Sequence, residues 1–159
     1  MPTIELETQI KSDINICFDR SRSIDLHKIS TAKTKEEAID GRKSGLINLD
    51  EFVTWSATHF GIKQKLTSKI TEFNRPFHFR DEQLKGAFKF IIHDHYFETL
   101  GDRVKMKDVF SFQSPLGLMG RLIDKIILTD YLTKILKERN AIIKEFAETT
   151  KWELILHDR

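Results

Sequence analysis

The chain has 159 residues, of which 40% are hydrophobic and 31% charged, and its formal net charge is +2. This length fits one folded domain with a sizeable core, and the composition excludes long disordered segments. Acidic and basic residues alternate along the chain without the concentrated basic face that nucleic-acid binding requires, so we expect no nucleic-acid partner.

The N-terminal segment predicts a strand followed by two short helices. Residues 4–10 alternate between apolar and polar, as a half-buried strand does. Ser12 or Asp13 is suited to cap a helix whose buried side carries Ile14, Cys17 and Phe18. Residues 24–29 indicate a second short helix or an irregular stretch.

The single cysteine, Cys17, has no partner for an internal disulfide, which favours a reducing, cytoplasmic location. We expect it to be a buried residue and not a nucleophile. No apolar run reaches the roughly 18 residues that span a bilayer, and the first residues lack a signal-peptide pattern. We therefore expect no stable insertion into a membrane.

The middle of the chain predicts consecutive strands. Their expected ranges are 37–43, 52–60, 64–73 and 77–84, with a link at residues 44–50 and turns at Gly61, 74–76 and 85–86. The β-branched and aromatic side chains at Val53, Thr54 and Trp55 favour a pleated sheet. Pro76 fits a turn because proline has no backbone N–H to donate to a ladder.

A long hairpin is the clearest feature of the sequence. Gly101-Asp102 is a two-residue turn signal between alternating runs at 87–100 and 103–112. If Leu100 and Arg103 flank the turn, one face carries these cross-strand pairs: Ile91 with Phe112, His93 with Phe110, His95 with Asp108, and Phe97 with Met106. An apolar face with a few converging polar groups is typical of a ligand pocket.

Helical periodicity replaces strand periodicity after the hairpin. Ser114 fits an N-cap and Pro115 a first helical residue. Apolar residues from Leu116 onward, among them Met119, Leu122, Ile123, Ile126 and Ile127, recur at spacings of three and four up to about residue 149. Such a helix is roughly 50 Å long. We expect one domain over residues 1–150 and a tail over residues 151–159.

These elements define an α+β domain in which a strongly curved antiparallel sheet of about six to seven strands wraps around the long C-terminal helix. Several short stretches along these elements are distinctive: Val-Thr-Trp-Ser-Ala-Thr-His-Phe-Gly at 53–61, Thr-Ser-Lys-Ile-Thr at 67–71, Arg-Pro at 75–76, Phe-Arg-Asp-Glu-Gln at 79–83, Gly-Ala-Phe at 86–88, His-Asp-His at 93–95, Asp108, and Pro-Leu-Gly at 115–117. In their order and spacing they resemble the helix-grip superfamily of START lipid-transfer domains, pollen-allergen-like proteins and polyketide cyclases, called SRPBCC, and in particular its small bacterial members.

The resemblance implies an internal cavity for a hydrophobic ligand, between sheet and helix. The residues expected to line it are Trp55, His59, Phe79, Ile91, His93, His95, Phe97, Met106, Asp108, Phe110, Phe112, Ile127 and Arg139. His95 opposite Asp108 is a candidate acid/base pair or a buried pair that fixes the hairpin register. Arg139 either neutralises an acidic ligand, extends outward, or pairs with an internal acid such as Asp81.

We therefore expect a protein that binds a small lipid-like or aromatic molecule, as a monomer or homodimer. One alternative is a cyclase- or dehydratase-type enzyme that uses His95 and Asp108. Another is an interaction module whose interior is filled by its own phenylalanines. The His93-x-His95 pair suggests a metal with Asp108 or His59 as third ligand, but no further His/Cys cluster completes the set, so we expect no metal and no cofactor.

Overall fold

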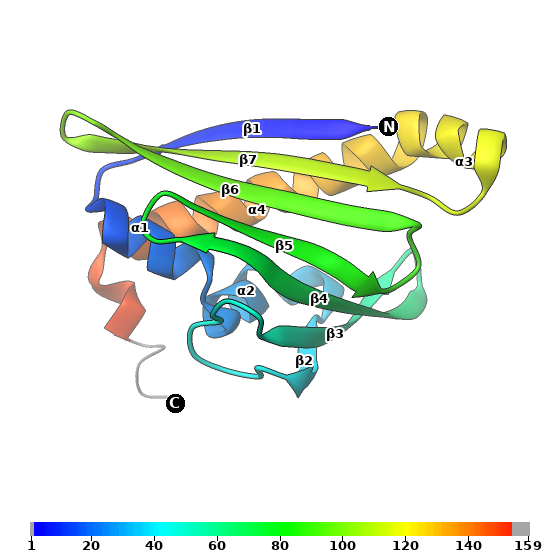
Figure 1. Ribbon diagram of the computed structural model, residues 1–159, viewed down its shortest axis with the longest axis horizontal. Helices are drawn as coiled ribbons and strands as arrows, with labels where there is room; N and C mark the ends of the chain where they lie inside the picture. The colour runs from blue at the N-terminus through cyan, green and yellow to red at the C-terminus, as the bar shows by residue number, and fades with distance from the viewer. Residues whose placement is uncertain (1, 154–159) are drawn as a thin grey trace.

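A seven-stranded antiparallel sheet, formed within the described residues 2–153 of a computed structural model, curves around the C-terminal helix (Figure 1). The spatial order of the strands is β1-β7-β6-β5-β4-β3-β2. The strands are β1 (Thr3–Ile10), β2 (Glu37–Gly41), β3 (Phe52–His59), β4 (Ile62–Asn74), β5 (His78–Lys85), β6 (Phe90–Leu100) and β7 (Arg103–Gln113). The helix-grip architecture predicted above is confirmed.

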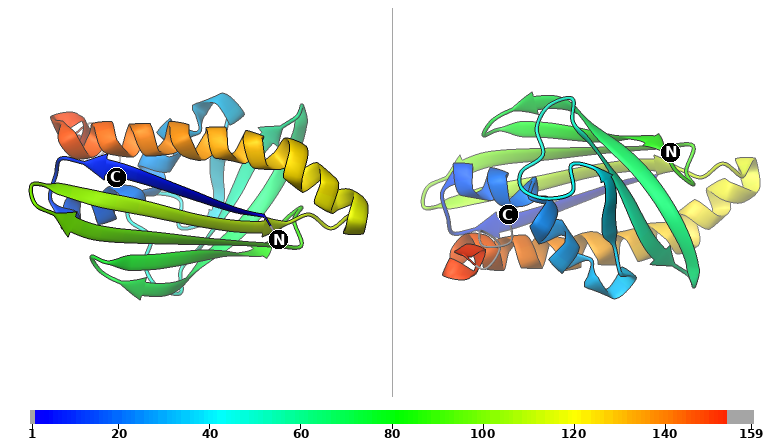
Figure 2. Two further views of the ribbon diagram at one scale, coloured as in Figure 1. Left: turned by 90° about the horizontal axis from the view of Figure 1, so that it is seen from above. Right: turned by 90° about the horizontal axis from the view of Figure 1, so that it is seen from below.

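The helices all lie on one side of the sheet (Figure 2). They are α1 (Ile14–Ser21), α2 (Ile24–Ser30), α3 (Gly117–Ile123) and α4 (Thr129–Glu148), with a π-helical turn at Asp124–Leu128 between the last two and short 3-10 turns at Ala32–Thr34 and Thr150–Trp152. Helix α4 packs along β1 and against α1 and α2. The expected tail at residues 151–159 lies mostly outside the described residues.

The predicted hairpin and its register are confirmed. Leu100 pairs with Arg103, and His95 lies opposite Asp108. The turn required this outcome, because a two-residue connection leaves one way to align the two strands. The boundaries of other strands differ by a few residues; β2, for example, ends at Gly41, where the backbone has a φ of 73°.

The predicted start of the C-terminal helix is wrong. The helix begins at Gly117, and Ser114 makes no side-chain capping bond. The backbone N–H of Ser114 instead donates to Asp124 Oδ2 at 2.9 Å, and Gly117 takes a φ of 57°. The chain therefore bends before the helix, and the bend is held by the buried Asp124, the first residue of the π-helical turn that follows α3.

The apolar stripe predicted for the beginning of this helix is also not buried. Met119 is 72% exposed and Ile127 51% exposed. The reason is that α3 extends past the end of the strands (Figure 2), so it has no sheet to pack against. Ile127 lies in the π-helical turn after α3, and its exposed side chain is not among the residues that line the cavity, so the expectation that it lines the cavity is wrong.

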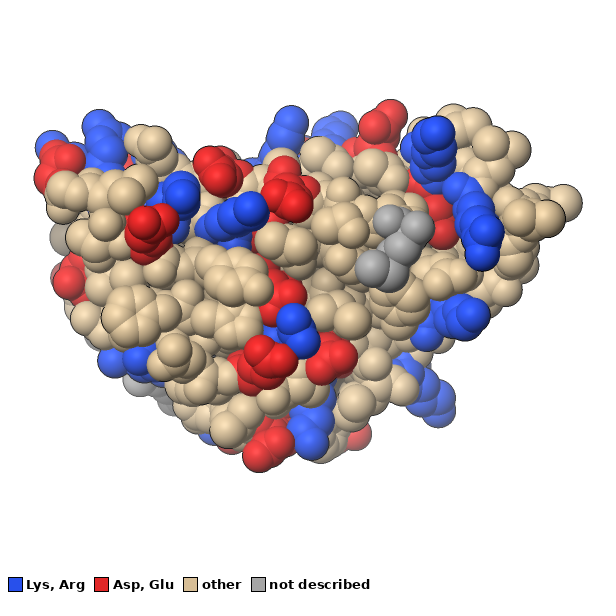
Figure 3. Space-filling view, turned by 45° about the horizontal axis from the view of Figure 1, so that its top comes forward, with Lys and Arg blue, Asp and Glu red and all other residues tan. Residues whose placement is uncertain are grey.

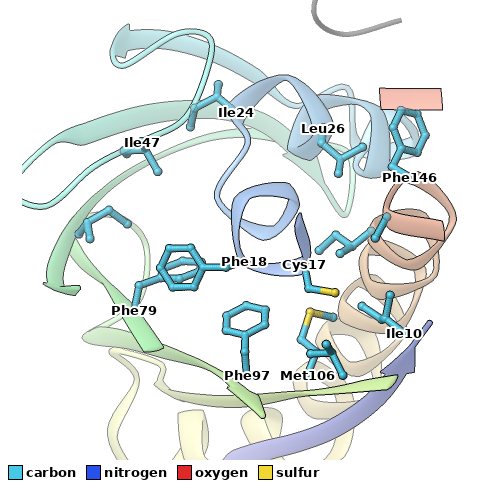
Figure 4. Packing of buried hydrophobic residues seen from close by; sticks show 14 of the residues in the cluster. Ile10, Cys17, Phe18, Ile24, Leu26, Ile47, Phe79, Phe97, Met106 and Phe146 are labelled. Carbon is cyan, nitrogen blue, oxygen red and sulfur yellow. The ribbon is translucent and has the colours of Figure 1, made fainter. Parts of the chain in front are cut away.

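The core beneath α1 is built from aromatic rings. Phe18 packs edge-on against Phe73 and Phe79, with ring centroids 5.3 Å apart in each pair, and lies at the same distance from Phe97. Figure 4 shows Phe18 beside Phe79 and Phe97. Asp13 caps the helix that presents Phe18, accepting from the N–H of Asn15 at 2.8 Å. The sequence-based N-cap at this position is confirmed.

Cys17 lies in the same core, beside Met106 (Figure 4), and its side chain is inaccessible. Burial raises the pKa of its thiol to about 12, so it stays protonated at neutral pH. The interpretation of Cys17 as a buried structural residue is confirmed.

Acidic and basic side chains are interspersed on the surface shown in Figure 3. Among the described residues, no helix has the length and apolar character needed to cross a membrane.

Replacing Phe18 with alanine tests how far the aromatic core holds α1 against the sheet. We expect Phe18→Ala to lower the free energy of unfolding by about 3–5 kcal/mol, because the surrounding rings cannot collapse into the space left behind. Urea denaturation measures the change. Phe77→Ala is the matched control, since Phe77 is 55% exposed, and an equal loss in both variants would contradict this account.

Candidate functional site

A cavity of about 210 Å³ lies between the concave face of the sheet and α4. Its apolar wall comes from strands β3 to β7, from α2 and from one side of α4. The apolar lining residues are Ile24, Ile47, Val53, Trp55, Leu66, Ile70, Phe79, Phe88, Ile91, Phe110, Leu132, Ile135 and Leu136. The interaction-module alternative requires an interior filled by phenylalanines, and this cavity shows that the interior is not filled.

A second hollow, of about 520 Å³, lies beside residues 41–44 and 50–52. Its lining comes from a surface loop and the strand ends beside it, and it contributes no histidine. The internal cavity is the better candidate site because apolar walls and buried polar side chains meet there.

Four ionisable side chains converge on one wall of this cavity: Asp81, His93, His95 and Arg139. Strand pairing places them there, because Asp81 lies opposite His93 on β5 and β6, and His95 follows on the same face of β6. Arg139 reaches the group from α4. Behind them, Asp108 and Asn140 are fully or almost fully buried.

Asp108 is the acceptor at the centre of this cluster. Its Oδ1 accepts from His93 Nε2 at 2.7 Å, and its Oδ2 accepts from the Asn140 side-chain amide at 2.7 Å. Arg139 Nη1 lies 3.4 Å from Oδ1. The carboxylate therefore connects β6, β7 and α4.

His95 is held between two carboxylates. Its Nε2 donates to Asp81 Oδ2 at 2.7 Å, and its Nδ1 lies 3.3 Å from Asp108 Oδ1. The ring stacks on Phe79, with centroids 4.1 Å apart. Both nitrogens of His95 are thus engaged by protein groups, whereas the Nδ1 of His93 has no hydrogen-bond partner among the described residues.

The two histidines differ in charge for physical reasons. Burial and the neighbouring His95 lower the pKa of His93 to about 4, so this imidazole is neutral at pH 7. Burial opposes the charge of His95 as well, but its hydrogen bonds to Asp108 and Asp81 raise its pKa. Although burial alone raises the pKa of Asp108, its bonds from His93 and His95 and the charge of Arg139 hold that pKa well below its usual range.

Arg139 does not extend outward to solvent. It is buried, donates from Nη1 to the Asn140 side-chain oxygen at 2.9 Å, and donates from Nη2 to the backbone carbonyl of Ser21 at 3.3 Å. Of the three roles expected for Arg139, pairing with an internal acid is the one observed. The acid within ion-pair distance is Asp108, not Asp81.

A second polar group lines another part of the cavity. His27 Nε2 lies 3.0 Å from Glu36 Oε1, and the ring of His27 lies against Trp55, with centroids 4.3 Å apart. His59 Nδ1 forms a 2.8 Å hydrogen bond with the Tyr131 hydroxyl. Burial opposes the charge of Glu36, but His27 lowers its pKa below the ordinary value.

The sequence-predicted site residues divide into two groups. Those that line the cavity are Trp55, His59, Phe79, Ile91, His93, His95, Phe110 and Arg139. Phe97, Met106, Asp108 and Phe112 were also expected there, but like Ile127 they do not line it. Phe97 and Met106 lie near the turn end of the hairpin, where α1 covers them: Phe97 contacts Phe18, and the Ser21 hydroxyl donates to the Met106 sulfur at 3.3 Å.

Phe112 and Asp108 also fail to line the cavity, because neighbouring side chains cover them. Phe112 is fully buried and packs edge-on against Phe88, which stands between it and the cavity, with ring centroids 5.7 Å apart. Asp108 is covered by the side chains it binds. Alternation along a strand gives the face of a residue, but it does not say which neighbours cover that face.

Sequence reasoning missed the role of Asp81 beside the histidines, and it missed Asn140, His27 and Glu36 altogether. The segment between β5 and β6 is not a two-residue turn, so the pairing of Asp81 with His93 was not readable from the sequence. Asn140 follows Arg139 directly, and a polar pair within an apolar helical stripe was the available signal.

Replacing Asp108 with asparagine tests the central position of this carboxylate. We expect Asp108→Asn to lower the free energy of unfolding by about 3–5 kcal/mol, because Arg139 then remains buried without an ion-pair partner. Chemical denaturation followed by circular dichroism measures the loss. Asp102→Asn in the exposed turn is the matched control and is expected to change little; equal effects in the two variants would refute the assignment.

No protein-family model and no curated protein sequence matches this chain. Solved structures do match: the protein TTHA0849 from Thermus thermophilus has 13% identity and a TM-score of 0.70, covering 89% of this chain and 97% of that one. Major latex-like protein 151 from Panax ginseng has 15% identity and a TM-score of 0.69, covering 93% and 98%. Ara h 8.0201 has 13% identity and a TM-score of 0.60, covering 89% and 97%. The chain therefore has the same helix-grip fold as these proteins.

Proposed function

We propose that this protein binds a small hydrophobic ligand, with an aromatic or lipid-like body and one polar end, in the cavity between the sheet and α4. The observation that carries the proposal is the cavity itself, in which apolar walls surround two groups of hydrogen-bonded polar side chains, the larger being Asp81, His93, His95 and Arg139. Ligand sites of this kind use apolar walls for affinity and a few polar groups for orientation. The helix-grip fold supports this general type of function.

The size of the cavity selects small ligands. Its volume of about 210 Å³ lies below the range of roughly 300–1,000 Å³ that is usual for drug-sized molecules. One or two fused rings, or a short acyl chain, suit this space. Trp55, Phe79 and Phe110 would provide flat apolar contacts for such a body.

The polar end of the ligand is best matched by a hydroxyl group. Neutral His93 presents an unpartnered lone pair at Nδ1, because its Nε2–H donates to Asp108. The neighbouring donors on His95 and Arg139 already bind carboxylates, the Asn140 side chain and the Ser21 carbonyl. A ligand that brings its own donor satisfies His93, whereas an apolar ligand leaves this buried nitrogen without a partner.

A fluorescent aromatic alcohol, 2-naphthol, tests the cavity as the binding site. We expect it to bind the wild-type protein, and we expect Ser68→Phe to weaken binding at least about tenfold, since Ser68 lines the cavity and a phenyl ring would occupy it. Fluorescence titration measures both. Lys65→Phe is the control: Lys65 is exposed on the opposite face of the same strand and should leave affinity unchanged.

Naphthalene, which lacks the hydroxyl group of 2-naphthol, tests the site proposed for the polar end of the ligand. Wild type should prefer 2-naphthol over naphthalene by roughly 3–10-fold, the value of one hydrogen bond. His93→Leu should remove that preference while still binding naphthalene. Absence of binding in wild type, or binding that both phenylalanine variants retain, would refute the carrier function.

A second candidate function is proton transfer on the bound ligand, in the manner of a cyclase or dehydratase. The neutral, Asp108-oriented His93 supports it, since an imidazole with a free lone pair beside a cavity is suited to act as a general base. His95, the acid/base candidate from sequence, is less suited because Asp81 and Asp108 engage its nitrogens.

Exchange of the α-protons of a small aromatic ketone in deuterated water tests this second function. With acetophenone as probe, we expect wild type to accelerate exchange at least about tenfold over His93→Gln, because only the imidazole offers a base at that point. Proton NMR follows the exchange, and His78→Gln is the control for a histidine outside the cavity. Equal exchange rates in wild type and His93→Gln would exclude His93 as the base.

A further inference from the structure

We propose that Asp81, His93 and His95 form a binding site for a divalent first-row transition metal, with Zn²⁺ as the representative ion. One ligand atom from each of the three residues lies within 4.8 Å of the other two. Two imidazoles and one carboxylate are a common ligand set for such ions. The metal site itself is argued from the protein ligands alone. Only the identity of the group on the open side of the metal rests on the proposed ligand-binding function.

Asp108 prepares His93 to bind a metal. The Nε2–H of His93 donates to Asp108 Oδ1 at 2.7 Å, which leaves the lone pair on Nδ1. That nitrogen lies 3.9 Å from Asp81 Oδ2, with no hydrogen-bond partner among the described residues. A carboxylate bound to the far nitrogen of a ligating histidine fixes its tautomer and raises its basicity, as outer partners in metal sites do.

Asp108 stands in a similar relation to His95. The Nδ1 of His95 lies 3.3 Å from Asp108 Oδ1, while its Nε2 lies 2.7 Å from Asp81 Oδ2. A metal would take the place of the proton that now lies between Nε2 and that carboxylate. One buried aspartate thus orients both imidazoles toward the third ligand.

The charges of the cluster leave room for a cation. Metal binding would displace the proton on His95 Nε2, and with both imidazoles then neutral, Asp81 and Asp108 contribute two negative charges and Arg139 one positive charge. Arg139 lies on the far side, where its contacts are Asp108, Asn140, the Ser21 carbonyl and His95 Nδ1. Asp81 then loses the hydrogen bond from His95 Nε2, so Asp81 is the acid that the metal ion would neutralise in place of that proton.

The three ligands leave the cavity side of the metal open. Asp81, His93 and His95 all line the cavity, and a site with three protein ligands keeps a position for water or another oxygen ligand. In such a site the hydroxyl of the proposed ligand would coordinate the ion. Metal binding, a direct hydrogen bond from the ligand hydroxyl to His93 and proton abstraction all use the lone pair on His93 Nδ1, so only one of the three can occur at a time.

A second cluster in the described part of the chain provides an internal comparison. Glu72, His78 and Asp94 also lie within 4.8 Å of one another. There, however, Arg80 donates to both oxygens of Asp94 at 2.9 Å, and His78 donates at 2.7 Å. That carboxylate is already neutralised by the guanidinium, so we expect no metal there.

Titration of chelator-treated protein with Co²⁺ tests the proposal, because the visible absorption of this ion reports nitrogen ligands and coordination number. We expect one equivalent to bind wild type and Zn²⁺ to displace it. His93→Gln and Asp81→Asn should weaken binding at least about 100-fold. His78→Gln, the control in the comparison cluster, should bind as wild type does, and Asp108→Asn should weaken binding about 10–100-fold.

Absence of Co²⁺ binding in wild type would overturn the proposal, as would binding that His78→Gln abolishes and His93→Gln retains. Circular dichroism establishes that each variant is folded, and Asp81→Asn is the mildest variant because Asp81 is partly exposed. Binding of 2-naphthol to chelator-treated protein separates the two proposals: if it persists without Co²⁺ binding, the metal site alone fails. Co²⁺ binding without 2-naphthol binding would leave the metal site supported and the carrier function refuted.

Discussion

The buried carboxylate of Asp108 is the point on which this structure depends. It has no exposed surface, yet it joins a sheet strand to the long helix through Asn140, Arg139 and His93. An isolated charge at this depth is very unfavourable, so these partners are a condition of folding. Because they come from β6 and α4, satisfying Asp108 also fixes how the helix lies across the sheet.

That requirement explains why polar groups gather at the cavity wall. Arg139 and His93 each contact Asp108 through one nitrogen, and both residues also line the cavity. The same network that stabilises the interior therefore orients groups a ligand would meet, and a second carboxylate, Asp81, extends it through His95. The three functional proposals differ in what the lone pair on His93 Nδ1 binds: a ligand hydroxyl, a proton taken from a ligand carbon, or a metal ion.

Local patterns predicted much of the fold. The capping of α1 by Asp13, the β6–β7 register and the burial of Cys17 follow from turn chemistry, side-chain alternation and residue size. Predictions that failed needed information about neighbours. Ile127 has an apolar side chain at a helical spacing, but that side chain is half exposed to solvent. Met106 faces the concave side of the sheet, but α1 covers it.

The sequence by itself determined that His93, His95 and Asp108 share one face of one hairpin, because a two-residue turn and strict alternation permit a single register. Only the tertiary structure decided their partners. The link between β5 and β6 does not fix its own register, so the approach of Asp81 to His95 depends on how the whole sheet pairs. The rotation of α4 that brings Arg139 and Asn140 to Asp108 depends on packing between layers, which no local pattern encodes.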